Sequence, residues 1–222
     1  MKIKENTPKA IILIIIGMSV IACQDALIKL ISSETNIFFI LFFRALLGMI
    51  LLSIFLIIKK EPIIFKTHYP TLTIIRGLMF FIAFSLYFFS LSKLSLALAV
   101  TLFFLCPFFI SILSVIFLNE TIGLKRWLAL VIGFVGVYLV MNPDIDNFNI
   151  YTTFPIICAF LYSLTMIIQK KTSVKDNLFS QIFHIYICAV ISSLAIVLIT
   201  GNGNYNDSIN DNFQFFKTLV FK

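Results

Sequence analysis

Long apolar segments alternate with short polar breaks along most of this chain. A helix needs about 20 mostly apolar residues to cross the hydrocarbon core of a membrane. The segments lack the alternation of apolar and polar residues that strands of a transmembrane barrel show. The pattern predicts about seven transmembrane helices, at residues 10–31, 37–58, 73–91, 96–118, 124–141, 151–170 and 178–200.

The polar breaks between these segments are short, at four to fourteen residues each. Connections of this length place neighbouring helices side by side and antiparallel. None is long enough to separate two soluble domains. Because only helices and closed barrels satisfy their backbone hydrogen bonds in lipid, the pattern predicts an all-α membrane protein.

The composition is that of a membrane protein rather than a soluble one. Hydrophobic residues make up 60% of the 222-residue chain and charged residues 12%, whereas soluble domains carry about 25% charged residues. These proportions exclude a soluble globular enzyme and a disordered chain. The four cysteines lie inside apolar segments without the spacing of a metal or disulfide motif. We therefore expect no metal and no cofactor.

The positive charges are unevenly distributed between the two sides of the predicted bundle. If the N-terminus is cytoplasmic, eleven of the 17 Lys and Arg residues lie in cytoplasmic segments and three lie outside. Cytoplasmic loops of membrane proteins carry such an excess. We predict a cytoplasmic N-terminus, and the net charge of +7 then needs no nucleic-acid partner to explain it.

An internal repeat is indicated when the sequence is shifted by 141 residues, which aligns the first two predicted helices with the last two. The second copy would be inverted in the membrane, as in many secondary transporters. We expect residues 1–141 to form a five-helix unit and residues 142–200 the first two helices of a second, inverted unit. Residues 201–222 then form a polar tail and the start of an eighth, truncated helix.

Several motifs resemble those of EamA-type drug/metabolite transporters. They are Asp25–Lys29, Phe43–Ala45, Arg76–Gly77, Pro107, Asn119–Thr121, Trp127 and Gly133–Val137. Within that family the sequence is similar to bacterial members that take up riboflavin or S-adenosylmethionine. The resemblance implies ten helices in two inverted five-helix units, of which this chain supplies seven. It also implies an inner (plasma) membrane location.

Charged residues inside the predicted spans are candidates for a functional site, because each is costly to bury in lipid. Asp25 and Arg44 lie at similar depths on adjacent helices, and Lys29 lies one turn from Asp25. We expect Asp25 and Arg44 to form an ion pair. Two interpretations stay open: a polar vestibule that binds substrate or couples a proton, and a structural lock between the first two helices.

Other polar residues in the spans complete the candidate set for substrate binding or coupling. They are Gln24, Tyr87, Thr101, Tyr162, Gln169, Gln181 and His184. Each either faces a cavity or bonds to a neighbouring helix. Pro107 removes a backbone hydrogen bond in mid-span, so we expect a kink there, with gating as its candidate role.

Four further residues have structural rather than functional expectations. Arg76 is expected to extend to the lipid headgroups. Glu120 is expected to cap a helix or to pair with Lys125 or Arg126. Gly133 and Gly136 are expected to permit close helix packing.

The function predicted from these observations is a multi-pass inner-membrane secondary transporter of a small metabolite that works by alternating access. The alternative is a truncated, non-transporting membrane fragment or an assembly subunit. The sequence contains no enzyme motif, and its two histidines are 116 residues apart. The expected partners are a small-molecule substrate and the lipid bilayer, without nucleic acid, and assembly into a homo-oligomer is left open.

Overall fold

The structure, a computed structural model, describes residues 7–31, 37–60, 66–141 and 150–200, and no strand occurs within these ranges. A single turn of 3₁₀-helix, Ile150–Thr152, precedes α7. The α-helices are α1 (Thr7–Ile31), α2 (Ile37–Lys59), α3 (Pro70–Lys93), α4 (Leu96–Phe103), α5 (Cys106–Leu118), α6 (Leu124–Met141), α7 (Thr153–Thr172) and α8 (Leu178–Thr200).

Six helical segments within the described residues are long and apolar enough to cross a membrane. They are Ile14–Ile31, Ile37–Lys59, Pro70–Lys93, Leu96–Leu118, Ile150–Thr172 and Leu178–Leu198. The fourth of them consists of α4 and α5 together, and α6 adds a shorter apolar stretch, Trp127–Gly136. The prediction of an all-α membrane protein is confirmed.

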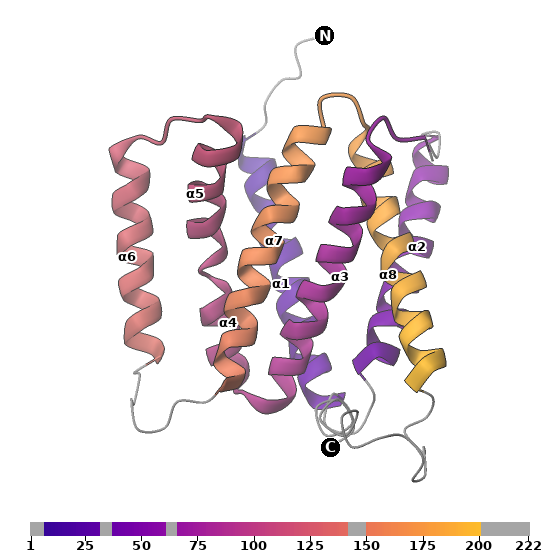
Figure 1. The fold of residues 1–222 in the computed structure, drawn as a ribbon, viewed down its shortest axis with the longest axis horizontal. Helices are drawn as coiled ribbons and strands as arrows, with labels where there is room; N and C mark the ends of the chain where they lie inside the picture. The colour runs from indigo at the N-terminus through magenta and orange to yellow at the C-terminus, as the bar shows by residue number, and fades with distance from the viewer. Residues whose placement is uncertain (1–6, 32–36, 61–65, 142–149, 201–222) are drawn as a thin grey trace.

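Successive spans run in opposite directions, and α7, α1 and α3 lie in the middle of the view, with α8 and α2 on the side opposite α6 (Figure 1). Helix α3 packs against both α7 and α8, while α2 packs on α8 and α5 packs on α7. Helix α6 lies at one edge, and its side chains are largely exposed. The N-terminal half of α1 is likewise exposed, which suits side chains that face lipid.

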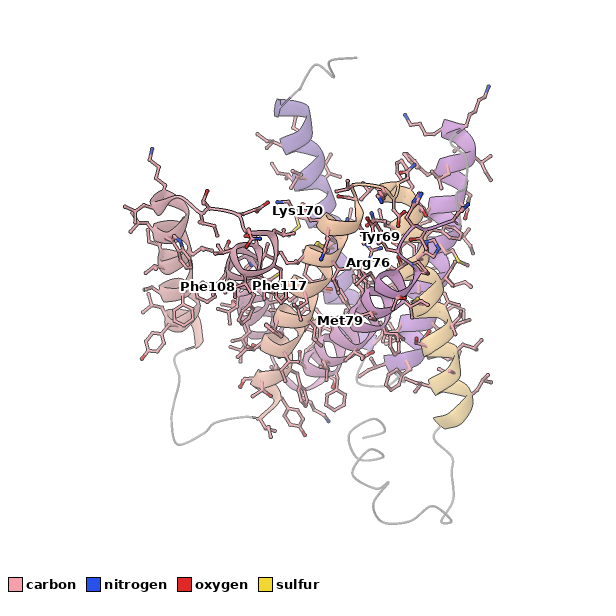
Figure 2. The ribbon with its side chains drawn as sticks, turned by 45° about the horizontal axis from the view of Figure 1, so that its top comes forward. Tyr69, Arg76, Met79, Phe108, Phe117 and Lys170 are labelled. Carbon is pink, nitrogen blue, oxygen red and sulfur yellow. The ribbon has the colours of Figure 1, made fainter. Side chains whose placement is uncertain are left out.

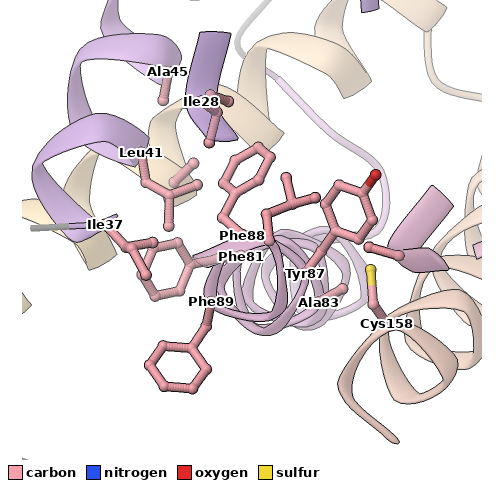
Figure 3. Packing of buried hydrophobic residues seen from close by; sticks show 13 residues of the cluster. Ile28, Ile37, Leu41, Ala45, Phe81, Ala83, Tyr87, Phe88, Phe89 and Cys158 are labelled. Carbon is pink, nitrogen blue, oxygen red and sulfur yellow. The ribbon is translucent and has the colours of Figure 1, made fainter. Parts of the chain in front are cut away.

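The buried core is built around α3. Phe88 and Leu91 of α3 are fully buried, and Ile28 of α1 and Leu41 of α2 belong to the same cluster (Figure 3). Cys158 brings α7 into this cluster from the other side of α3. Buried side chains from α1, α2, α4, α7 and α8 therefore meet on α3, which is the element that positions the site described below.

Two glycines allow α8 to approach its neighbours closely. A Cβ atom at Gly48 of α2 would lie 2.7 Å from the ring of Tyr186. At Gly77 of α3 it would lie 2.6 Å from the side chain of Cys188. The predicted packing role of Gly133 and Gly136 does not appear in the described structure, where a Cβ at either position would meet nothing within 4 Å. Both lie on the exposed helix α6, which explains the difference.

The directions of the helices agree with an inverted repeat. Figure 1 shows α1 and α7 running in opposite directions, and likewise α2 and α8. The division at residue 141 stays a prediction. Part of the expected second unit, residues 142–149, and the expected tail and eighth helix, residues 201–222, lie outside the described residues.

Candidate functional site

The span formed by α4 and α5 is interrupted beside Pro107. The Phe104 amide donates to the carbonyls of Val100 and Thr101 at 3.1 Å, and regular helix resumes at Cys106. Pro107 has no N–H to donate to the preceding turn, so the helix cannot continue through it unchanged. The expected kink is confirmed, and its role in gating stays a prediction.

Ser163 of α7 holds the interrupted span in place. Its hydroxyl is fully buried and lies 3.1 Å from the Cys106 carbonyl oxygen and 2.6 Å from the Ala159 carbonyl oxygen. By donating to Cys106, Ser163 joins α7 to the first turn of α5. The sequence analysis missed this residue, because a lone serine in an apolar segment carries no signal of its partner. Thr101, by contrast, donates to the Ala97 carbonyl of its own helix.

Asp25 of α1 is bound to Tyr87 of α3. The Tyr87 hydroxyl donates to Asp25 Oδ2 at 3.0 Å, and both residues are buried. The other carboxylate oxygen, Oδ1, accepts no hydrogen bond within the described residues. It nevertheless keeps some accessible surface, because it does not belong to the fully buried polar atoms that lack a partner. Asp25 therefore keeps one oxygen available to a ligand.

Arg44 of α2 lies over two aromatic rings of α3. The guanidinium carbon is 5.0 Å from the centroid of Phe84 and 5.2 Å from that of Phe88, which is cation–π geometry. The expected ion pair with Asp25 does not form, because their charged atoms are more than 4.0 Å apart in the described structure. The matched depths predicted from the sequence gave no information on how the two helices face each other.

Lys29 binds the end of α3 rather than Asp25. Its Nζ atom donates to the carbonyls of Leu91 and Leu94 at 2.6 and 2.7 Å. Carbonyls in the last turn of a helix lack intrahelical donors, and a lysine is a common partner for them. Lys29 therefore fastens α1 to α3 at the predicted external end of the bundle.

Aromatic rings from three helices connect Asp25, Arg44 and the helix break. Phe84 contacts Tyr162 of α7 at 5.9 Å between ring centroids and Tyr87 at 6.3 Å. Phe103, the last residue of α4, lies 5.5 Å from Tyr87 and 5.6 Å from Tyr162. We call these four residues the aromatic cluster. It places the buried carboxylate, the guanidinium and the interrupted helix around one region of the bundle.

A second polar network lies at the predicted cytoplasmic end, where α3 begins. Arg76 donates to the Gln181 side-chain oxygen at 2.5 Å and to the Gln181 carbonyl at 2.6 Å. Arg76 is only 1% exposed, so the expectation that it extends to the headgroups is wrong. It lies in the same region as Tyr69 and Lys170 (Figure 2). Gln181 supplies acceptors for both terminal nitrogens of the guanidinium, while the Arg76 Nε atom is buried without a partner in the described structure.

The same network includes the carboxylate of Asp176, which binds residues of the segment that precedes α3. Asp176, between α7 and α8, accepts from Thr67 Oγ1 at 2.5 Å and from the His68 amide at 2.9 Å. The His68 ring nitrogen Nδ1 also lies 2.9 Å from it. Burial opposes the charge of Asp176, but these hydrogen bonds outweigh it and hold the pKa of Asp176 below its usual value. No pattern in the sequence indicated this contact between two polar connections.

The remaining candidate residues lie in different surroundings. His184 Nδ1 is 2.7 Å from the Ser180 carbonyl of its own helix. Gln24 has a buried amide nitrogen without a partner in the described structure. Gln169 is half-buried near the end of α7. Glu120 pairs with Lys170 of α7 rather than with Lys125.

Five of the predicted residues fall into two regions. Asp25, Arg44, Tyr87 and Tyr162 are brought together around the aromatic cluster, whereas Gln181 belongs to the network at the predicted cytoplasmic end. Of the two, the first region combines a buried carboxylate and a half-buried guanidinium with an interrupted helix. It is therefore the candidate substrate site.

Comparison with known proteins identifies relatives over most of the chain. The S-adenosylmethionine uptake transporter of Rickettsia bellii (strain RML369-C) is 30% identical over 184 residues, which are 83% of this chain and 61% of that protein. The pseudopaline exporter of Pseudomonas aeruginosa is 23% identical over 189 residues, 85% of this chain and 65% of that protein. The riboflavin transporter of Vibrio cholerae is 29% identical over 92 residues, 41% of this chain and 30% of that protein.

These relatives agree with the absence of an enzyme motif in the sequence, since all are named as transporters. The chain spans about three fifths of the length of the S-adenosylmethionine transporters that it matches. No solved structure matches it. The EamA-like transporter family matches residues 8–142, which is more than half of the chain. This protein therefore belongs to the EamA-like transporter family.

Proposed function

We propose that this chain binds a small metabolite and carries it across the inner membrane by alternating access. The substrate site lies at the aromatic cluster, between Asp25 of α1 and Arg44 of α2. The observation that carries the proposal is that a buried carboxylate, an arginine without a counter-ion in contact and an interrupted helix occur together.

The free-energy cost of placing ionisable side chains inside membrane spans supports this choice of site. An ionisable side chain inside a membrane span costs a few kcal/mol by insertion scales, so such residues mark substrate or ion pathways. Interrupted helices in transporters line substrate sites near the middle of the membrane. Asp25 and Arg44 meet the first condition, and the break beside Pro107 meets the second.

Alternating access requires contacts at one end of the bundle to open while those at the other end close. The network of Arg76, Gln181 and Asp176 connects α3 and the connection before it with α7 and α8. Lys29 connects α1 with α3 at the opposite end. These two sets of contacts are the proposed closures of the cytoplasmic and external ends.

S-adenosylmethionine is the first substrate to test, because relatives that are 29–30% identical over 79–83% of the chain carry that name. The 222-residue chain is reconstituted in lipid nanodiscs, and binding of radiolabelled S-adenosylmethionine is measured. Asp25→Asn is expected to weaken binding at least tenfold. Ser19→Ala, an exposed position on the same helix, is the matched control and leaves binding unchanged.

Uptake into proteoliposomes tests transport separately from binding. Saturable uptake that Asp25→Asn abolishes supports the carrier. Binding without uptake by the folded chain contradicts transport by this chain and favours the alternative, a non-transporting fragment or assembly subunit. Absence of binding by any metabolite named for the relatives removes the basis for the proposed site.

A further inference from the structure

We infer that the site recognises a zwitterion, with the substrate's carboxylate on Arg44 and its cationic group on Asp25. This inference rests on the proposed function, because it assigns a substrate class to the same site. The substrate would carry a carboxylate together with an ammonium or sulfonium group, as amino acids and their sulfonium derivatives do.

Arg44 has the features of a carboxylate anchor. A guanidinium carries five N–H donors in a planar fork that matches the two oxygens of a carboxylate. Within the described residues, the Arg44 guanidinium donates no hydrogen bond and forms no ion pair, and its nitrogens are not sealed by protein atoms. Phe84 and Phe88 lie within cation–π distance of the guanidinium carbon, and neither ring takes up an N–H donor, so the donors keep their capacity to bind a ligand.

Asp25 supplies the opposite charge with one oxygen already in use. Tyr87 donates to Oδ2 and so orients the carboxylate, while Oδ1 keeps its capacity to accept. A cationic group bound at Oδ1 also lies near the aromatic cluster, because Tyr87 contacts both Phe84 and Phe103. Ring faces attract ammonium and sulfonium cations, so the rings and the carboxylate act on the same group.

The separation of Asp25 and Arg44 favours a ligand with both charges. The two groups are not in contact, so neither neutralises the other directly. A ligand with one charge would leave the second protein charge buried and unpaired, which is costly in a low-dielectric site. A zwitterion supplies both counter-ions at once. Lys29 is not the carboxylate anchor, because its Nζ binds the carbonyls of Leu91 and Leu94.

Competition for the nanodisc-bound chain tests this assignment. Labelled S-adenosylmethionine is displaced by its unlabelled form, by decarboxylated S-adenosylmethionine, which lacks the carboxylate, and by S-adenosylhomocysteine, which lacks the sulfonium. We expect the decarboxylated form to compete at least tenfold less well, the size of one lost charge-assisted hydrogen bond. S-adenosylhomocysteine is expected to lose less affinity than the decarboxylated form, because it keeps its ammonium group.

Two variants assign each charge to its residue. Arg44→Gln is expected to bind the parent and the decarboxylated form equally, and Arg44→Lys to retain part of the preference. Asp25→Asn is expected to keep the preference for the carboxylate while losing that for the sulfonium. Circular dichroism and thermal unfolding confirm that each variant is folded. A folded Arg44→Gln variant that still rejects the decarboxylated form overturns the assignment.

A second experiment tests the zwitterion site independently of the choice of S-adenosylmethionine as substrate. If the wild-type chain does not bind S-adenosylmethionine, the proposed substrate is wrong, and thermal stabilisation is measured with L-methionine and with L-methioninamide, its uncharged-carboxyl counterpart. Stabilisation by methionine alone, lost in Arg44→Gln, supports a zwitterion site. Stabilisation by neither compound, or equally by both, overturns it.

Discussion

At the scale of single residues, two opposite charges are accommodated in the membrane spans by different means. Asp25 accepts a hydrogen bond from Tyr87, and Arg44 is placed over the rings of Phe84 and Phe88. Neither means neutralises the charge fully. Both charged groups therefore remain available to a ligand, whereas a direct pair would have used up both.

The bond between Tyr87 and Asp25 is expected to contribute to stability as well as to the site. Tyr87→Phe removes the hydroxyl and leaves Asp25 Oδ2 without its donor, at a cost of about 1–2 kcal/mol. Thermal unfolding of the purified protein in detergent measures the loss. Tyr138→Phe is the matched control, since Tyr138 is exposed on α6. Equal stability of the Tyr87→Phe variant and the wild type would show that the bond contributes nothing.

At the scale of helices, packing depends on where small residues face a neighbour. Gly48 and Gly77 bring α2 and α3 against α8, while Gly133 and Gly136 lie on a helix face that meets nothing within 4 Å in the described structure. The four glycines are indistinguishable in the sequence, because each stands in an apolar helix. Their roles differ only because α8 packs between α2 and α3 and α6 lies at the edge.

Alanine at two glycine positions is therefore expected to have opposite effects. Gly77→Ala places a methyl group 2.6 Å from the Cys188 side chain, and overpacking of this kind costs about 1–3 kcal/mol. Gly133→Ala enters open space and gains up to about 1 kcal/mol from helix propensity. Thermal unfolding of the two variants in the same detergent checks the prediction. A destabilised Gly133→Ala variant or a stabilised Gly77→Ala variant would contradict it.

At the scale of the whole molecule, the network around Asp176 connects two segments that are far apart in the chain. Thr67 and His68 precede α3, and Asp176 precedes α8, more than 100 residues later. The network and the Arg76–Gln181 contact join α3 to the α7–α8 pair at one end of the bundle. Both proposed inverted units therefore contribute to the same closure.

Acid is expected to weaken this connection. The pKa of Asp176 is lower in the folded protein than its usual value, because Thr67 and His68 donate to its charged form. The stabilisation is present above the unfolded pKa of about 3.9 and is lost as the pH falls through the folded pKa. Thermal unfolding between pH 7 and pH 3 should show a steeper acid loss in the wild type than in Asp176→Asn. Identical acid slopes would contradict the prediction.

The orientation in the membrane is the second prediction at this scale. The distribution of Lys and Arg predicts a cytoplasmic N-terminus, and the up-and-down order of the helices extends it to every connection. Reporter fusions after Lys66, Arg126 and Lys175 are expected to be cytoplasmic, and a fusion after Asn147 external. A cytoplasmic reporter at Asn147 would overturn this topology.

The sequence by itself determined which segments become membrane helices. Transfer of a side chain from water to lipid depends on that side chain alone, so a run of apolar residues predicts a span whatever surrounds it. The break beside Pro107 was predictable for the same reason, because a missing N–H is a property of the residue. The candidate residues Asp25, Arg44 and Tyr87 were found because charges and hydroxyls stand out in apolar segments.

Only the tertiary structure decided which of those residues meet. Asp25 binds Tyr87, 62 residues away, and Arg76 binds Gln181, 105 residues away. Such contacts depend on how the helices are rotated and which helix lies next to which, and the energy that sets this is shared by many small packing contacts. The depth of a residue in the membrane follows from its position within its own helix. Its partner on another helix does not. For this reason the sequence predicted a pair of Asp25 with Arg44, and the fold instead kept the two charges apart.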